Sequence, residues 1–388
     1  MKIFRRCFIQ SRQIDYNRSG ITSFEEQVFF VKRLQPTRHC SRPFVTVIIL
    51  FGLGLTFTLL ASACGTGQTR TPAATPTLTL TATYPPTLTP TPVPLGQPEN
   101  PFVIGLVDEN NDPQMGAAAN ELAVQISRLS GLSVRGLVYP SYQELVDDLS
   151  FGKVHIAWLP PLTYLYASQR GLAEAALLTN HFGVYFYGTQ FLANVESNFT
   201  PFHDPISGLN QVDGPTALSQ FQDMRPCLVE PTSAAGYILP AGLLKMYGVT
   251  TAPAVITQSH PAVVRALYVK GICDFGATYA ISGDPRTASA VQEDLPSATS
   301  RIIIIWRSDP VIPNLNLSFI SGLSESSWQA LSAAFLELSK TPEGKGLLSL
   351  SAGNYQIEEM KAVDDTAYAQ LRSAAEVLGI DLGEMIGK

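Results

Sequence analysis

The chain has 388 residues, of which 45% are hydrophobic and 15% charged, and its formal net charge is −6. The charge is unevenly distributed: residues 1–43 hold nine Lys and Arg against three Asp and Glu, whereas residues 64–388 hold 17 against 29, a net charge of −12. An acidic surface of this size argues against nucleic acid or an anionic membrane surface as a partner.

The N-terminal segment has the pattern of an export signal. A basic leader is followed by Phe44–Ala63, which is uncharged and strongly apolar. The run Leu60–Gly65, LASACG, resembles a bacterial lipoprotein processing site, and it predicts that Cys64 becomes a lipid-modified N-terminus. Alternatively, Phe44–Ala63 stays as a membrane span, because about 20 apolar residues can cross a bilayer. In both cases we expect a membrane-tethered protein on the extracytoplasmic face, with residues 1–63 as leader and signal.

Residues 64–99 are rich in Thr and Pro and nearly free of charge. This composition cannot bury a core and favours an extended spacer. The segment therefore predicts a linker between the membrane and the folded part.

From Phe102 the pattern alternates between strand and helix. We expect strands at Phe102–Val107, Ser133–Val138 and Val154–Trp158, with helices at Gln114–Ser130 and Ser141–Leu149 between them. Ser141 followed by Glu144 forms a capping box at the start of the second helix. This order predicts parallel pairing in an α/β sheet.

A second alternating run follows the aromatic-rich extended segment Phe182–Asn194. The chain then ends in predicted helices. These patterns predict an α/β fold with two lobes, each a mixed, mostly parallel sheet flanked by helices: lobe I comprises residues 100–194 and 314–388, and lobe II residues 195–313. The predicted elements after residue 195 are strands at Cys227–Val229, Ala254–Thr257, Cys273–Thr278, Arg301–Trp306 and Asn316–Ile320, and helices at Ala234–Tyr247, Pro261–Val269, Glu325–Lys340, Pro342–Leu350 and Asp364–Leu378.

The segment Cys227–Tyr237, CLVEPTSAAGY, predicts an oxyanion site. A strand ends in a hydroxyl-bearing turn that opens a helix, where outward N–H groups and the helix dipole favour negative charge. We expect Thr232, Ser233 and the N–H groups of Ala234–Gly236 to receive the anion. His260 begins a second such unit. Because the exported part is acidic, the anion would be held by local dipoles and neutral donors.

Two cysteines, Cys227 and Cys273, fall in predicted strands of the folded part. Outside the cell they could pair. Because both strands look buried, we slightly favour two free thiols. The sequence has no CxxC and no His/Cys cluster with metal-ligand spacing, so we expect neither metal nor cofactor.

Several segments resemble the phosphonate-, phosphate- and phosphite-binding proteins of bacterial ABC importers. They are SYQELVDDLSFGK, VHIAWLPP, TQSHPAVVRALYVKGICDFGATY, IIWRSDPVIPNL and TPEGKGLLSL, in order within residues 100–380. The resemblance implies a type II periplasmic-binding-protein fold, a small anionic ligand between the lobes, a membrane permease as partner and a monomeric chain.

The resemblance also implies site residues. Ligand-contacting aromatics fall at Tyr142 and Tyr187, and the anion-binding imidazole at His260; Tyr279 ends the strand that follows. Of the family's three hydroxyl positions, Ser233 keeps its hydroxyl, whereas Ala234 and Ala235 lack theirs.

The carboxylates that hold a ligand amine in aminophosphonate binders have no counterpart, since Ile281 and Leu315 lie near their places. We therefore expect a small phosphorus oxyanion, or another small anion or heterocycle such as a sulfonate.

Two other classes stay open. One is an enzyme of the kind that handles pyrimidine or thiamine precursors, although it would need a nucleophile beside a base, and the only thiols lie inside predicted strands. The other is a ligand-sensing domain. Because the sequence contains no enzyme motif of the GxSxG, HExxH or P-loop type, we expect a binding protein and not an enzyme.

Overall fold

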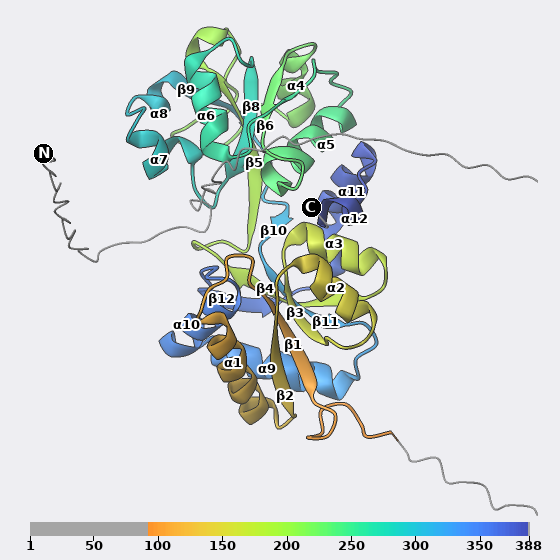
Figure 1. Ribbon diagram of the computed structural model, residues 1–388. Helices are drawn as coiled ribbons and strands as arrows, with labels where there is room; N and C mark the ends of the chain where they lie inside the picture. Colours follow the sequence, from red (N-terminus) through yellow and green to blue (C-terminus); the bar gives the residue numbers. More distant parts are fainter. Residues whose placement is uncertain (1–91, 387–388) are drawn as a thin grey trace, which may run out of the picture. The chain divides into compact units, whose positions relative to one another are not determined.

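The computed structural model describes residues 92–386, so the leader, Cys64 and nearly all of the expected linker lie outside the described residues. Among residues 92–386, no helix combines the length and the apolar character that crossing a membrane requires. The predicted α/β class is confirmed, because two six-stranded sheets are each flanked by helices (Figure 1).

The first sheet has the strand order β12-β4-β11-β3-β1-β2. As expected from the βαβαβ pattern, β1 pairs in parallel with both β2 and β3, while β11 and β12 join antiparallel. Its strands are β1 Phe102–Val107, β2 Val134–Tyr139, β3 Ile156–Leu159, β4 Ala173–Asn180, β11 Asn316–Ile320 and β12 Glu359–Ala362.

The second sheet has the order β10-β5-β8-β6-β7, and β9 pairs with β5. Strands β6, β7 and β8 are parallel, while β5 is antiparallel to β8 and β9. Its strands are β5 Phe186–Asn194, β6 Pro226–Leu228, β7 Val255–Ile256, β8 Phe275–Ala280, β9 Ile302–Arg307 and β10 Ile312–Pro313.

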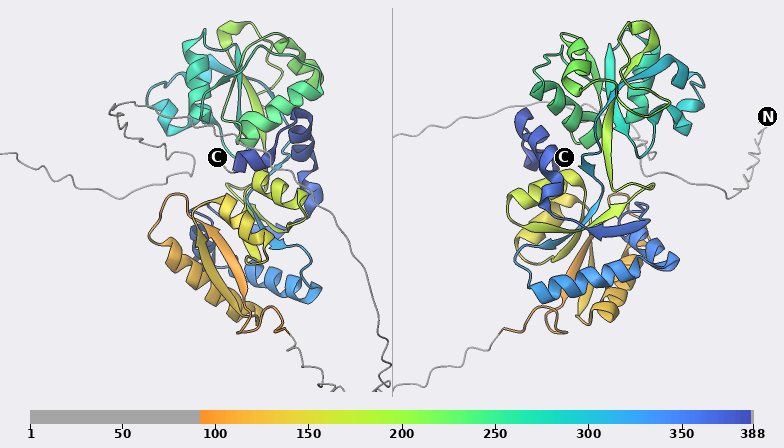
Figure 2. Two further views of the ribbon diagram at one scale, coloured as in Figure 1. Left: turned by 45° about the vertical axis from the view of Figure 1, so that its right-hand side comes forward. Right: turned by 180° about the vertical axis from the view of Figure 1, so that it is seen from behind.

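Helices cover both faces of each sheet (Figure 2). In the first sheet α1 packs with α9 and α10, and α2 and α3 lie against β1, β3 and β4; in the second, α6 contacts β8 and β5, and α5 contacts β5. The helices are α1 Met115–Ser130, α2 Tyr142–Ser150, α3 Pro161–Gln169, α4 Gly214–Leu218, α5 Leu239–Met246, α6 His260–Val269, α7 Ser289–Gln292, α8 Ala298–Arg301, α9 Glu325–Leu338, α10 Pro342–Ser351, α11 Ala369–Leu378 and α12 Leu382–Ile386.

The chain passes between the two sheets at two places, one before β5 and one after β10. The second passage follows β10 (Ile312–Pro313) and leads to β11 of the first sheet. The first precedes β5 and does not lie near Asn194, because all of Phe186–Asn194 pairs with strands of the second sheet. Those partner strands lie more than 80 residues downstream, so no local pattern in the sequence specifies them.

The terminal helices also divide differently from the expectation. Helices α9 and α10 pack on α1 of the first sheet, but α11 packs on α5, which covers the second sheet. A Cβ built on Gly242 of α5 would lie 2.6 Å from the Cβ of Ala374 in α11, so this close approach requires glycine. The predicted helix Asp364–Leu378 therefore does not belong only to the first sheet, because its α11 part packs against a helix of the second sheet.

Cys227 and Cys273 form a disulfide, contrary to the free thiols that we favoured. Cys227 lies on β6, while Cys273 precedes β8 instead of lying inside a strand. Because β6 and β8 are neighbouring parallel strands, the two Cα atoms lie only 5.6 Å apart, which is within reach of a disulfide. Both residues are buried, so burial did not discriminate between thiols and a bridge.

Candidate functional site

The turn after β6 starts the helical segment at the centre of the predicted site. Ser233 caps η3, the π-helical turn Ala234–Ile238, which runs directly into α5. The Ser233 hydroxyl accepts a hydrogen bond from the N–H of Gly236 at 3.0 Å, and the Ser233 carbonyl accepts from Tyr237 and Ile238. The N–H of Gly236 is thus already bonded, whereas we had expected it to receive the anion.

The sequence explains why this turn lies tightly on the end of β6. A Cβ on Gly236 would approach the Val229 side chain to 2.3 Å, so only glycine fits. Ala234 and Ala235 are buried, while Thr232 is exposed. The N–H groups of Ala234 and Ala235 precede the first intrahelical hydrogen bond, so the helix itself provides them no acceptor.

His260 begins α6, with Ser259 as its cap, and is only 8% exposed. The backbone N–H of Tyr279 donates to His260 Nδ1 at 3.3 Å, which places the ring proton on Nε2. Burial lowers the pKa of His260 to about 4, so the ring is neutral at physiological pH. His260 is therefore neutral, with its ring proton on Nε2.

Two helix starts lie at the carboxyl ends of the parallel strands of the second sheet. Strands β6 and β7 are parallel neighbours, with Leu228 opposite Ile256, and each is followed by a helical start, η3 or α6. Ligands of open α/β sheets bind at the carboxyl ends of the strands. The pairing thus places Ser233 and His260 on adjacent connections at that edge.

Three predicted aromatics border one hydrophobic cluster. Tyr142, Tyr187 and Tyr279 are partly buried and pack against the cluster that contains Ala234 and Ala235. Tyr142 begins α2, Tyr187 lies in β5, and Tyr279 ends β8 with its ring 4.8 Å from that of His260. Desolvation, followed by the charge of Glu109, raises the pKa of Tyr142, so its hydroxyl stays protonated and can donate.

One residue that the sequence analysis passed over is Glu230, which precedes the turn. Its Oε2 atom is buried and has no hydrogen-bond partner among the described residues. A carboxylate two residues before Thr232 would repel an anion bound at the helix start, and a nearby positive charge would offset that repulsion.

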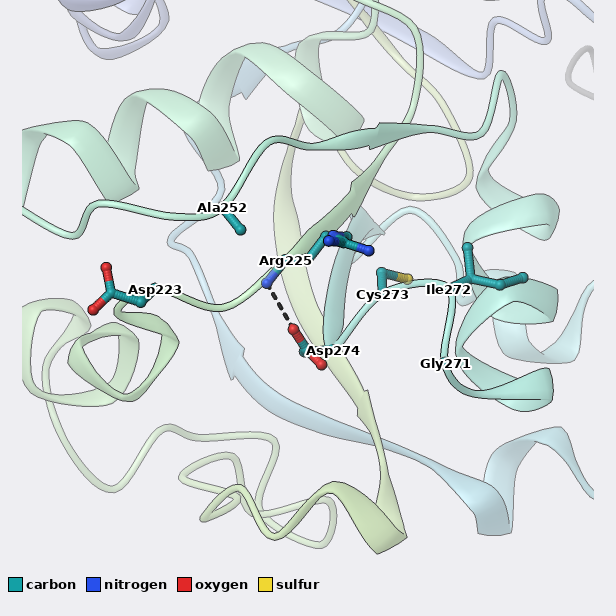
Figure 3. A pocket seen from close by; sticks show the side chains of 7 residues that line it. All are labelled: Asp223, Arg225, Ala252, Gly271, Ile272, Cys273 and Asp274. Atoms are coloured by element: carbon teal, nitrogen blue, oxygen red, sulfur yellow. Dashed lines mark hydrogen bonds between the residues drawn. The ribbon is translucent and has the colours of Figure 1, made fainter.

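A separate pocket of about 260 Å³ lies at the opposite edge of the second sheet, beside the disulfide (Figure 3). It contains none of the predicted site residues. One of its two carboxylates, Asp274, accepts the backbone N–H of Arg225 at 2.7 Å. Since the pocket pairs two carboxylates with a single guanidinium, its chemistry does not favour an anion. Its lining residues are Asp223, Arg225, Ala252, Gly271, Ile272, Cys273 and Asp274.

Within residues 92–386, no group of three or more His, Cys, Asp or Glu side chains is arranged so that it could hold a metal ion.

Two α/β sheets flanked by helices, with two helix starts at the carboxyl ends of parallel strands in the second, define a type II periplasmic-binding-protein fold, and similarity to solved structures agrees. The protein XAC2383 from Xanthomonas citri, bound to chloride ion, matches with a TM-score of 0.51 and 18% identity over 72% of this chain and 97% of that chain. The same protein bound to ATP matches with a TM-score of 0.50 and 18% identity, over 74% and 99%.

The chain belongs to the family of ABC transporter, phosphonate, periplasmic substrate-binding proteins, whose profile matches residues 104–368. The phosphonates-binding periplasmic protein of Escherichia coli (strain K12) is 24% identical over 222 residues, which cover 56% of this chain and 60% of that relative. The match thus spans less than two thirds of the relative's length. The family comprises substrate-binding components of transporters and not enzymes, which confirms that part of the prediction.

Proposed function

We propose that the chain is the solute-binding component of an ABC importer and binds a small phosphorus oxyanion: phosphate, phosphite or an alkylphosphonate. The observation that carries the proposal is the pair of helix starts after the parallel strands β6 and β7. Helix starts favour anions through their unpaired N–H groups and the helix dipole. Family membership supports a ligand of this chemistry.

In this proposal each site residue has a role. The N–H groups of Ala234 and Ala235, with the Thr232 hydroxyl, donate to the oxyanion, while Ser233 caps the turn. His260 donates through Nε2. The aromatics Tyr142, Tyr187 and Tyr279 enclose the ligand, and the protonated Tyr142 hydroxyl adds a further donor.

The wider organisation belongs to the same proposal. The two sheets act as lobes that hold the ligand between them and deliver it to a membrane permease. Cys64 carries lipid, and residues 64–99 give the monomeric binder reach from the membrane surface. Mass spectrometry of the mature protein should find a diacylglyceryl group on Cys64. An intact chain through Phe44–Ala63 would replace this tether with a membrane span.

The test is a thermal-shift screen of the folded part against phosphate, phosphite, methylphosphonate, sulfate and an alkylsulfonate. A ligand that binds only the native state raises the melting temperature. We expect phosphorus oxyanions to do so, and His260→Ala to weaken their binding by roughly ten- to a hundredfold in calorimetry, because one bond to a charged group is lost. If no phosphorus oxyanion shifts the wild type, the proposed ligand class is wrong.

A further inference from the structure

Arg307, the last residue of β9, is a half-buried cation without a carboxylate partner. Its guanidinium donates through Nε and Nη2 to Gln190 Oε1, at 3.2 Å in both cases. Within residues 92–386 it makes no ion pair. Its only side-chain acceptor is therefore a neutral amide, although a charge removed from water is normally paired.

Asp284, whose negative charge acts on Arg307, forms its direct ion pair with another arginine. Asp284 accepts from Nε and Nη2 of Arg286, with a shortest distance of 2.6 Å, and this pair is largely buried. Because Asp284 and Arg286 neutralise each other, the cluster keeps the charge of Arg307. Burial lowers the pKa of Arg307, which agrees with an incompletely compensated charge.

Hydrogen bonds and one peptide link connect this cation to the proposed site. Gln190, fully buried in β5, donates through Nε2 both to the Thr278 hydroxyl and to Asp284 Oδ1, at 3.3 Å in each case. Thr278 precedes Tyr279, whose N–H donates to His260 Nδ1. Arg307, Gln190 and Thr278 are register partners on three adjacent strands, so they share one face of the sheet.

We propose that Arg307 supplies the positive charge that balances the bound anion, acting across Gln190 and Thr278 at the edge that holds His260. This rests on the proposed function and deepens it: the preferred ligand form is a dianion, and the charge of Glu230 is offset. Two strand spacings put Arg307 about 10 Å from Thr278, and the proposed anion lies near the end of the Thr278 strand. For a dianion about that far from the guanidinium in a half-buried setting, the attraction is worth up to roughly a tenfold change in affinity.

The test measures inorganic phosphate binding by calorimetry in four proteins. Arg307→Gln should weaken binding roughly tenfold, whereas Arg307→Lys, which keeps the charge, should stay within about threefold of the wild type. Arg301→Gln is the matched control. It removes the same charge just before the other end of β9, where Arg301 pairs with Glu196, and it should bind like the wild type.

A charge role has a signature that a purely structural role lacks. At about pH 8 phosphate is a dianion, and at about pH 5.5 it is a monoanion. His260, with a pKa of about 4, is neutral at both values. The affinity lost by Arg307→Gln should therefore be larger at the higher pH.

The groups that interact with the charge of Arg307 are Asp284, Arg286 and His203, and the His203 pKa is lowered by burial and then by Arg307. The comparison is therefore made in a His203→Gln background as well, where this ring cannot titrate.

The outcomes separate this inference from the function beneath it. Wild-type binding together with unchanged binding by Arg307→Gln would overturn the role of Arg307 and leave the proposed function standing. If the wild type binds no phosphorus oxyanion, both fall. Ligand-free Arg307→Gln and Arg307→Met should melt at or above the wild-type temperature, because an unpaired half-buried charge is removed. Failure of both to fold would show a structural residue and overturn the proposal.

Discussion

Ile281 adopts a left-handed backbone conformation, with φ of 81°, in the residue that follows β8. This region crowds a β-branched side chain against its own backbone and costs on the order of 1–3 kcal/mol. The residue comes two positions after Tyr279, at the edge where the anion site is proposed. Backbone strain of this kind is found preferentially at binding sites. Because Ile281 is 39% exposed, burial of its side chain offsets little of the strain energy.

We expect Ile281→Gly to raise the free energy of unfolding by about 1 kcal/mol, since glycine adopts positive φ without strain. Ile272→Gly is the matched control: Ile272 is 41% exposed and is not among the positive-φ residues. There the same change should destabilise by roughly 0.5–1 kcal/mol. Urea unfolding of both variants gives the comparison, and equal signs would refute the strain.

His260 makes stability depend on pH. Its pKa falls from the ordinary value of 6.5 to about 4 because burial disfavours the charged ring. The unfolded chain thus takes up a proton at a higher pH than the folded one. Stability is then lost as the pH falls through the window between those values, by about 3 kcal/mol when complete.

The variant His260→Gln lacks this titration, so its unfolding free energy should fall less between pH 7 and about pH 4.5 than that of the wild type. Urea denaturation at both pH values measures the difference. Parallel losses in the two proteins would mean that other groups carry the acid sensitivity.

At the scale of residues, local signals were readable and distant ones were not. Ser141 caps α2 by accepting from the N–H of Glu144, as the capping box predicted. The neutral state of His260 depends on its contact with Tyr279 of β8, and the environment of Arg307 depends on Gln190 of β5. Both contacts join residues that are distant in the sequence, so no local pattern predicts them. The sequence analysis noted Arg307 only as a residue of the segment IIWRSDPVIPNL and predicted no role for it.

At the scale of elements, most strands and helices were predicted within a few residues. The segment Ala234–Tyr247 was read as one helix but begins as the π-helical η3, since the hydrogen bonds that widen this turn end on Ser233. Several elements were missed, among them α3 and β4. All but one of the eight residues of β4 are buried, and α3 is buried at four consecutive positions, so no amphipathic period marks either one. The other missed elements, all short, are α4, α7, α8, α12, β10 and β12.

The disulfide is the element-scale feature with the clearest energetic consequence. Cys227 and Cys273 are separated by 46 residues, and closing a loop of that length restricts the unfolded chain. In the chain-entropy account this contributes about 4 kcal/mol. Ser233 and His260 both lie inside the closed loop.

Reduction should therefore lower the free energy of unfolding by up to about 4 kcal/mol and weaken anion binding with it. Urea unfolding with and without reductant measures the loss, and thiol labelling confirms that the bond is open. The double variant Cys227→Ala/Cys273→Ala is the control, because its stability should not respond to reductant. An unchanged midpoint in the fully reduced wild type would contradict the expectation.

At the scale of the whole molecule, the fold class and the family followed from alternating elements and from motifs in the right order. The connections between the sheets did not. Strand β5 joins β8 and β9, and α11 packs on α5, through contacts between distant parts of the chain. Which distant strands and helices pack together depends on the shape and apolar area of whole element surfaces, and a local sequence pattern does not specify these.

Whether the disulfide between Cys227 and Cys273 can form depends on the compartment in which the chain is located. An exported chain is synthesised in the reducing cytosol, where cysteines remain thiols. There the segment that carries both helix starts has no covalent closure, and the newly made precursor holds its fold less firmly. A loosely folded precursor is easier to thread through a secretion channel. Oxidation on the far side then closes the loop that holds Ser233 and His260, the residues of the proposed anion site.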